Sequence, residues 1–366
     1  MKPDLNIQPI ENWLPVSGKP VIIAGPCSAE SADQVLTTAR GIARLEKVKV
    51  FRAGIWKPRT RPNSFEGVGE EGLKWMKAVK EETGMLLTTE VANAEHVELC
   101  LKYGIDILWI GARTTVNPFS VQEIANALKG VDIPVMVKNP INPDLQLWLG
   151  ALERVQGAGI TKLAAIHRGF SPFEKTPFRN IPKWELAIEM RRMLPNLPMI
   201  CDPSHIAGSR ELLPYVCQKA MDLDMTGLMI ETHIQPKVAK SDAEQQVTPE
   251  DLGKLLSSIT VRRSSAENLE FKSKLDQLRA EIDKLDDDLL QVLSTRMKVA
   301  EKIGEYKRDN EVTILQLNRW EEIMNKRLEI GQALGLSTDF TKQLYQMIHK
   351  ESIRKQEEIM NSAVKV

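Results

Sequence analysis

Charged side chains follow a series of short apolar segments in the first part of the chain. Six of them are cations: Arg52, Lys57, Arg59, Arg113, Lys138 and Arg168. A single cation after a strand is usually a solvated loop charge. Six cations around one cavity would repel one another unless anions lay between them. Because the planar guanidinium group suits both phosphate and carboxylate, the set predicts a site for phosphorylated, carboxylated small molecules.

A second set of residues has the chemistry of a metal site. Cys27, His205 and Glu231 stand at the ends of apolar runs, and Asp242 lies in the segment after the last run. A thiolate, an imidazole and carboxylates together suit a divalent transition metal such as Mn, Fe, Co or Zn better than Mg or Ca. The alternative for Cys27 is a small buried core residue, as free cysteines often are.

The apolar segments predict how these residues are positioned. Eight short runs alternate with longer amphipathic segments: Val21–Ala24, Val48–Arg52, Met85–Thr89, Ile107–Ile110, Pro134–Val137, Lys162–Ile166, Pro198–Cys201 and Gly227–Ile230. Alternating strands and helices form parallel βαβ units, and eight units in about 250 residues is the size of a (β/α)8 TIM barrel. Catalytic residues of that α/β fold lie at the carboxyl ends of the strands. A doubly wound open sheet is the alternative, although no Gly-x-Gly-x-x-Gly motif follows the first run.

The last part of the chain has a different composition. Proline occurs from Pro3 to Pro249 and not afterwards, and glycine becomes sparse. We therefore expect a barrel domain over residues 1–262 and an all-α three-helix domain over residues 263–366, with helices near 266–308, 317–334 and 337–360. The first helix, about 40 residues or 60 Å long, carries an apolar stripe that its own chain cannot cover. This predicts an intertwined homodimer through the helical domain.

The overall composition excludes several classes of function. The 366 residues include 49 basic and 49 acidic side chains, which excludes the global basic field of a nonspecific nucleic-acid binder. Apolar stretches reach about eight residues, well short of the roughly 20 that a membrane-spanning helix needs. The first residues, Met1 to Asp4, lack an apolar signal core, and four irregularly spaced cysteines are typical of reduced thiols. We therefore expect a cytoplasmic protein with neither nucleic-acid nor membrane partners.

Five ordered motifs resemble the microbial type I-beta family of 3-deoxy-D-arabino-heptulosonate 7-phosphate (DAHP) synthases. They are Gly25-Pro26-Cys27-Ser28, Lys57-Pro58-Arg59-Thr60, Ile110-Gly111-Ala112-Arg113, His167-Arg168-Gly169 and Asp202-Pro203-Ser204-His205. The resemblance implies the condensation of phosphoenolpyruvate with erythrose 4-phosphate, the first step of the shikimate pathway toward aromatic amino acids. The chain departs from the family's pattern after Lys138, where it reads Asn139-Pro140 in place of Arg-Gly.

The same resemblance implies roles for individual residues. Four would bind the metal ion, with Mn the first choice: Cys27, His205, Glu231 and Asp242. Three would hold the phosphate of phosphoenolpyruvate: Arg113, Lys138 and Arg168. Arg52 and Lys57 would lie at its carboxylate, and Arg59 with Thr60 would take the phosphate of the sugar. The metal would polarise the aldehyde, Glu90 would orient a water, and Lys57 or Lys138 would transfer protons.

The tail, from Leu278-Arg279 to Gln356, resembles the helical class of chorismate mutase. Arg296, with Arg279 from the partner chain, would clamp the two carboxylates of chorismate. The other implied substrate-binding residues are Lys307 and Gln356 at the ether oxygen, with Gln316, Arg319 and Ser352 in support. Gln316 stands where an aspartate is common, and Trp320 where the family has a glutamate for the substrate hydroxyl. We expect His349 to be a surface or packing residue.

The two resemblances together imply a bifunctional enzyme in which chorismate or prephenate, bound to the tail, lowers synthase activity. Two alternatives stay open. The barrel could be the related 3-deoxy-octulosonate 8-phosphate synthase, which uses a five-carbon sugar phosphate, although Lys57-Pro58-Arg59-Thr60 argues against it. The tail could be a non-catalytic dimerisation or sensor module.

Overall fold

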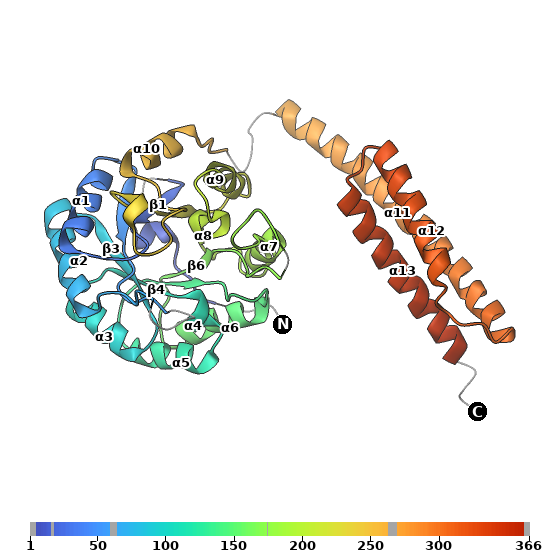
Figure 1. Cartoon of the computed structure of the whole chain (residues 1–366), viewed down its shortest axis with the longest axis horizontal. Helices are drawn as coiled ribbons and strands as arrows, with labels where there is room; N and C mark the ends of the chain where they lie inside the picture. Colours follow the sequence, from blue (N-terminus) through green and yellow to red (C-terminus); the bar gives the residue numbers. More distant parts are fainter. Residues whose placement is uncertain (1–4, 16–17, 59–63, 174, 263–268, 362–366) are drawn as a thin grey trace. The chain divides into compact units, whose positions relative to one another are not determined.

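The computed structural model describes residues 5–15, 18–58, 64–173, 175–262 and 269–361. The chain divides into two compact units, Met1–Ser264 and Ser265–Val366. In the first unit helices surround a ring of strands, and the second consists of long helices (Figure 1).

Eight parallel strands close into a barrel in sequence order. They are β1 (Val21–Gly25), β2 (Val48–Arg52), β3 (Leu86–Val91), β4 (Ile107–Ile110), β5 (Val135–Lys138), β6 (Leu163–His167), β7 (Met199–Cys201) and β8 (Gly227–Glu231). Strands β1 and β8 pair over five residues, from Val21↔Gly227 to Gly25↔Glu231, which closes the ring. The predicted (β/α)8 fold is confirmed, and the open doubly wound sheet is excluded.

Several strands end one or two residues later than their apolar runs. The last residues of β5, β6 and β8 are Lys138, His167 and Glu231, and Glu90 is the second-last residue of β3. Hydrophobic patterning cannot detect these positions because their side chains are polar. Their backbone nevertheless continues the hydrogen bonding of the strand. Polar groups on strands are held more rigidly than groups on loops.

The helices of the first unit cover the outside of the barrel. They are α1 (Ala32–Ala43), α2 (Glu70–Thr83), α3 (Ala94–Lys102), α4 (Ala112–Thr115), α5 (Pro118–Ala127), α6 (Leu145–Gly157), α7 (Trp184–Met193), α8 (Pro203–Ala207), α9 (Leu213–Asp222) and α10 (Pro249–Ser258). Side chains such as Asn93, Asp144 and Thr248 begin their helices by accepting a backbone N–H. One apolar cluster lies between helices and strands, and a second, which includes Ile23, Trp109 and Met136, fills the barrel interior.

The second unit contains three helices: α11 (Leu269–Asp309), α12 (Leu317–Ala333) and α13 (Thr338–Asn361). Both α11 and α12 pack on α13. The predicted three-helix tail is confirmed within the described residues. The apolar stripe of α11 stays largely uncovered by its own chain, with Leu285 61% exposed and Leu289 51% exposed. No helix in the described ranges has the length and apolar character needed to span a lipid bilayer.

Candidate active site

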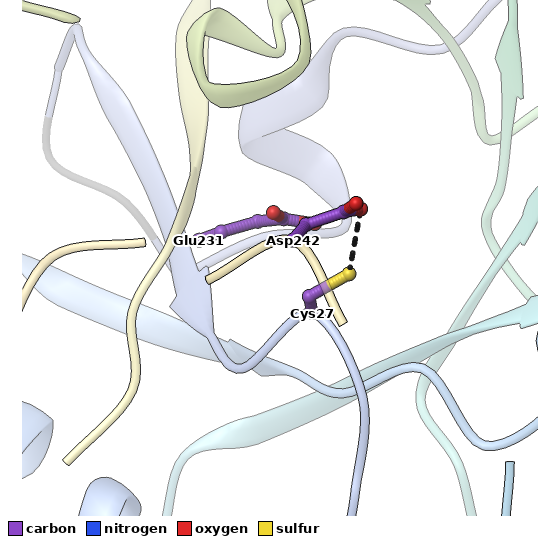
Figure 2. A group of neighbouring side chains, drawn as sticks. All are labelled: Cys27, Glu231 and Asp242. Carbon is purple, nitrogen blue, oxygen red and sulfur yellow. Dashed lines mark hydrogen bonds between the residues drawn. The ribbon is translucent and has the colours of Figure 1, made fainter. Parts of the chain in front are cut away.

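Three of the four predicted metal ligands lie together at the carboxyl end of the barrel. Cys27 follows β1, Glu231 ends β8, and Asp242 lies after the short helix η2 (Pro236–Val238). Their ligand atoms all lie within 4.8 Å of one another, and the Cys27 thiol donates to Asp242 Oδ2 at 3.2 Å (Figure 2). Residues so distant in the sequence meet because β1 and β8 pair where the barrel closes.

The fourth predicted ligand, His205, approaches this cluster through Glu231. Asp202 caps α8 by accepting the backbone N–H of His205 at 3.2 Å, and its Oδ1 lies 3.0 Å from the ring Nδ1. The other ring nitrogen, Nε2, lies 3.7 Å from Glu231 Oε1. His205 is therefore oriented toward the cluster, although it lies outside the group of ligand atoms that are mutually within 4.8 Å.

The electrostatics of the cluster fit a bound cation. Glu231 Oε1 is buried and accepts no hydrogen bond from the described residues. Burial raises the pKa of the Cys27 thiol to about 12, and the Glu231 carboxylate adds to the shift. A thiolate here therefore needs a compensating positive charge, which a dication supplies. Asp242 has a φ of +50°, a left-handed conformation that is uncommon for residues other than glycine and is typical of functional sites.

The predicted cations gather around this cluster. Lys57, Arg113, Lys138 and Arg168 line one cavity, together with Glu90, His205 and Asp242. Arg52 is 1% exposed, with its Nη1 3.3 Å from Glu231 Oε1. Lys57 Nζ lies 3.0 Å from Cys27 Sγ. Arg59 and Thr60 lie outside the described residues, so their contact with a sugar phosphate stays a prediction.

Two of these cations are buried with different partners. Lys138 forms an ion pair with Asp202 at 2.8 Å. Arg168 has the neutral partner Asn180, to whose Oδ1 its Nη1 donates at 2.7 Å. Burial lowers the pKa of Arg168 to about 10, so its guanidinium group stays charged at neutral pH. A buried charge beside a neutral amide is well suited to an anionic ligand.

Glu90 faces the same cavity from β3. The indole N–H of Trp109 donates to Glu90 Oε2 at 2.9 Å. A Cβ atom added at Gly111 would lie 2.1 Å from Glu90 Oε1, so glycine there leaves room for the carboxylate. The Glu90 carboxylate therefore lies at the cavity between the indole of Trp109 and the backbone of Gly111.

A second cavity, of about 430 Å³, lies within the helical unit. Six of the residues predicted for the mutase line it: Arg296, Lys307, Gln316, Arg319, Ser352 and Gln356. Arg296 Nη1 donates to Ser352 Oγ at 2.5 Å, and Gln356 Oε1 is buried without a hydrogen bond from the described residues. Arg279 does not line this cavity in its own chain; it is exposed and lies 3.4 Å from Asp276.

Two aromatic residues complete the wall of the second cavity. Trp320, in place of the expected glutamate, stacks on His349 with ring centroids 3.8 Å apart. His349 packs on Trp320, as expected of a packing residue, and its ring also lines the cavity. Burial lowers the pKa of His349, and the charges of Arg296 and Lys307 add to this, so the ring is neutral at neutral pH.

Each of the two units matches a known family. Residues 14–265 match the DAHP synthetase I family, which is more than half of the chain. The chain belongs to this family. Residues 278–357 match the family described as chorismate mutase type II.

Relatives of this DAHP synthetase I chain include enzymes with two names. The phospho-2-dehydro-3-deoxyheptonate aldolase of Thermotoga maritima is 33% identical over 226 residues, which cover 62% of this chain and 64% of the relative. The chain therefore spans less than two thirds of that relative. The 2-dehydro-3-deoxyphosphooctonate aldolase of Helicobacter pylori is 27% identical over 267 residues, covering 66% of this chain and 94% of the relative.

Solved structures show the same similarity. The crystal structure of the Thermotoga maritima DAHP synthase matches at 31% identity with a TM-score of 0.59, covering 70% of each chain. A truncated form of 3-deoxy-D-arabino-heptulosonate 7-phosphate synthase from the same organism matches at 28% identity with a TM-score of 0.57, covering 70% of this chain and 87% of that one.

Several residues of the DAHP synthetase I unit contact the site without a role assigned from the sequence, among them Arg179, Asp202 and Trp109. Arg179 lies 2.8 Å from Asp242 Oδ1 and donates to Gln245 Oε1 at 2.6 Å. It lies in a long polar segment between β6 and α7, away from any strand end. Asp202 was visible as part of a motif, and the proline after it is a signal of a helix N-cap. Trp109 looked like a core residue because it stands in an apolar run.

Proposed function

We propose that the barrel condenses phosphoenolpyruvate with erythrose 4-phosphate to form DAHP and inorganic phosphate. The observation that carries this proposal is the set of cations around the cluster of Cys27, Glu231 and Asp242. Three of these cations are buried: Arg52, Lys138 and Arg168. Two phosphates and one carboxylate supply the negative charge that such a cavity needs. Membership of the DAHP synthetase I family supports the same substrate pair.

The proposed roles follow the positions of the side chains. Arg113, Lys138 and Arg168 hold the phosphate of phosphoenolpyruvate, while Arg52 and Lys57 face its carboxylate. Arg59 and Thr60 take the phosphate of the sugar. C3 of phosphoenolpyruvate bonds to the aldehyde carbon, water adds at C2, and the C2–O bond to phosphate breaks. Glu90 orients this water, and Lys57 or Lys138 protonates the oxygen that the aldehyde becomes.

A divalent metal ion is the proposed cofactor. Cys27, His205, Glu231 and Asp242 would hold it, with Mn the first choice and Fe, Co or Zn as alternatives. When bound, the ion would polarise the aldehyde as a Lewis acid. Treatment with a chelator should abolish activity, and adding back Mn²⁺ should restore it.

The experiment that tests the barrel's function follows phosphoenolpyruvate consumption with each of two sugar phosphates. We expect turnover with erythrose 4-phosphate and little with the five-carbon arabinose 5-phosphate. The reverse preference would establish the related octulosonate reaction, which the name of the Helicobacter pylori relative describes. Arg168→Ala should raise the KM for phosphoenolpyruvate, whereas Arg354→Ala, on the exposed side of α13, should leave it unchanged.

We also propose that the tail converts chorismate to prephenate. The reaction is an intramolecular rearrangement, so it needs groups that hold the reactive conformer and stabilise charge rather than a nucleophile. Arg296, Lys307 and Gln356 line the cavity that supports this role, and Gln316, Arg319 and Ser352 lie around them. Loss of chorismate measured for the full chain, with Arg296→Ala expected to reduce it by about 100-fold, tests the assignment. No turnover by the unaltered protein would leave the tail as a binding module.

We propose that the active tail is a homodimer. The exposed stripe of α11 and the position of Arg279 outside its own chain's cavity support this arrangement, in which each copy supplies Arg279 to the other's site. Burying such a stripe against a second copy removes apolar surface from water.

We further propose that ligand in the tail lowers synthase activity. Prephenate should inhibit phosphoenolpyruvate consumption by the full chain. Arg296→Ala should weaken that inhibition, while the rate of phosphoenolpyruvate consumption without prephenate should stay unchanged. Equal inhibition of both proteins would remove the tail site from regulation.

The proposed functional domains are residues 1–262 and 263–366. The boundary between them lies two residues before the division between the two compact units. A cytoplasmic location is a further proposal, supported by four buried cysteines that are free thiols.

A further inference from the structure

Trp109 contacts three of the residues on which the proposed condensation depends. It lies on β4, where it pairs with Glu90 of β3 and Met136 of β5. Its side chain is 1% exposed and belongs to the apolar cluster inside the barrel. The indole is therefore part of the packed interior directly beneath the polar mouth.

The two chemical features of the indole meet different partners. Its N–H donates to Glu90 Oε2 at 2.9 Å. Its π face lies near two cations, with Arg52 Cζ 5.0 Å and Lys138 Nζ 5.5 Å from the ring centroid. One rigid side chain thus contacts an acid through its edge and two cations through its face, as the charge distribution of an indole ring favours.

These contacts restrict groups that otherwise have several rotamers. Like charges repel at short range, and the negative face of the ring offsets part of the repulsion between Arg52 and Lys138. Glu90 is confined on one side by the indole N–H and on the other by Gly111, which leaves room only because it has no Cβ. Arg52 Nε and Nη1 make no hydrogen bond to the described residues, so the ring face is one of the contacts that hold this guanidinium group.

We propose that Trp109 is a positioning residue of the barrel reaction, with its N–H fixing the carboxylate of Glu90 and its π face placing Arg52 and Lys138. The proposal rests on the proposed function of the barrel. It assigns separable effects to the two features of the ring: the N–H acts on turnover through Glu90, and the face acts on phosphoenolpyruvate binding through the cations.

Three substitutions separate the two features. Trp109→Phe keeps an aromatic face and loses the donor, Trp109→Gln keeps a donor and loses the face, and Trp109→Leu loses both. We expect the Phe variant to lower kcat about tenfold or more with little change in the KM for phosphoenolpyruvate. The Gln variant should raise that KM about tenfold while kcat changes less. The Leu variant should show both defects.

Trp148 provides a matched control. It is fully buried in the apolar layer between helices and strands, and its N–H donates to Val137 O at 3.0 Å. Trp148→Phe therefore removes a buried indole hydrogen bond without contacting the side chains of Glu90, Arg52 or Lys138, and we expect near-normal kcat and KM. Thermal unfolding of all four variants establishes that each is folded at the assay temperature.

Phosphoenolpyruvate affinity, measured by calorimetric titration without a sugar phosphate, provides the second measurement. It should fall in the Gln and Leu variants and stay near the wild-type value in the Phe variant. The proposal is overturned if folded Phe and Gln variants share one kinetic defect, or if Trp148→Phe matches them. Wild-type protein that binds phosphoenolpyruvate but turns over neither sugar phosphate would contradict the proposed function, while the affinity pattern would still test the placing of the cations.

Discussion

Asp202 Oδ2 lies 2.8 Å from Lys138 Nζ, and both side chains are buried. The same carboxylate holds the ring of His205 through Nδ1. One acid therefore couples a proposed phosphate-binding cation to a proposed metal ligand, so substrate and metal positions depend on a single side chain.

Replacing Asp202 with asparagine should weaken both functions. The amide keeps the volume but loses the charge that pairs with Lys138 and fixes the tautomer of His205. We expect metal affinity to fall by about 10- to 100-fold, as for other residues that orient metal ligands. Competition with a chromogenic chelator measures this affinity. Asp132→Asn, at an exposed acid paired with Lys162, is the control and should have no effect; equal metal affinity in Asp202→Asn and wild type would contradict the coupling.

Adding a methyl group at Gly111 should displace Glu90. The new Cβ would overlap Glu90 Oε1, and the carboxylate has the indole of Trp109 on its other side. If Glu90 orients the attacking water, Gly111→Ala should reduce kcat by about 100-fold. Steady-state kinetics with both substrates gives this value, and Gly150→Ala in α6, where a Cβ meets no atom within 4 Å, is the control. Unchanged kcat in a folded Gly111→Ala protein would remove Glu90 from the chemistry.

The buried ring of His167 should make the barrel less stable in mild acid. Burial among Trp148, Phe170 and Trp184 lowers the pKa of His167 to about 3. Below the unfolded-state pKa of roughly 6.5, the unfolded chain binds a proton that the folded chain rejects. Stability is therefore lost as pH falls from about 6.5 toward 3, by up to roughly 1.4 kcal/mol per pH unit.

Urea unfolding at two pH values tests this expectation. Between pH 6.5 and 5.5 the wild type should lose about 1 kcal/mol more than His167→Phe, which has no proton to bind. The same pH dependence in both proteins would show that the ring is protonated in the folded state.

Charging the exposed stripe of α11 should dissociate the proposed dimer. Leu289 is 51% exposed in the isolated chain, so glutamate there costs little within one copy but places a charge in the proposed interface. Leu289→Glu should sediment as a monomer and lose chorismate mutase activity, because Arg279 no longer reaches the second copy. Lys302→Glu, at an exposed position of the same helix, is the control. A dimer that survives the change at Leu289 would place the interface elsewhere.

The barrel could be predicted from the sequence because its signals are local. Each strand is a short apolar run, and polar residues with recognisable chemistry stand at its end. Cys27 and Glu231 were found in this way, since the closed topology brings strand ends together. The three tail helices were equally visible because proline is absent and the apolar spacing is helical.

The contacts missed from the sequence depend on tertiary structure. Arg179 reaches Asp242 from a segment without regular structure, and no spacing rule links positions so far apart. Trp109 stands in an apolar run, so its sequence context predicts a core residue. Only the structure shows that its N–H contacts Glu90 and that its ring face lies near the cations. The packing of His349 was expected, but its place in the cavity wall was not, because one face of α13 is both packed and part of a cavity.

The pairing of β1 with β8 has a consequence for biosynthesis. Cys27 directly follows β1, the first strand to leave the ribosome, whereas Glu231 and Asp242 are made after strands β1 to β7. A nascent chain that stops short of β8 has nearly every cation of the mouth but no complete set of metal-binding groups. If the proposed metal site is used, we expect metal loading to wait until translation has passed Asp242.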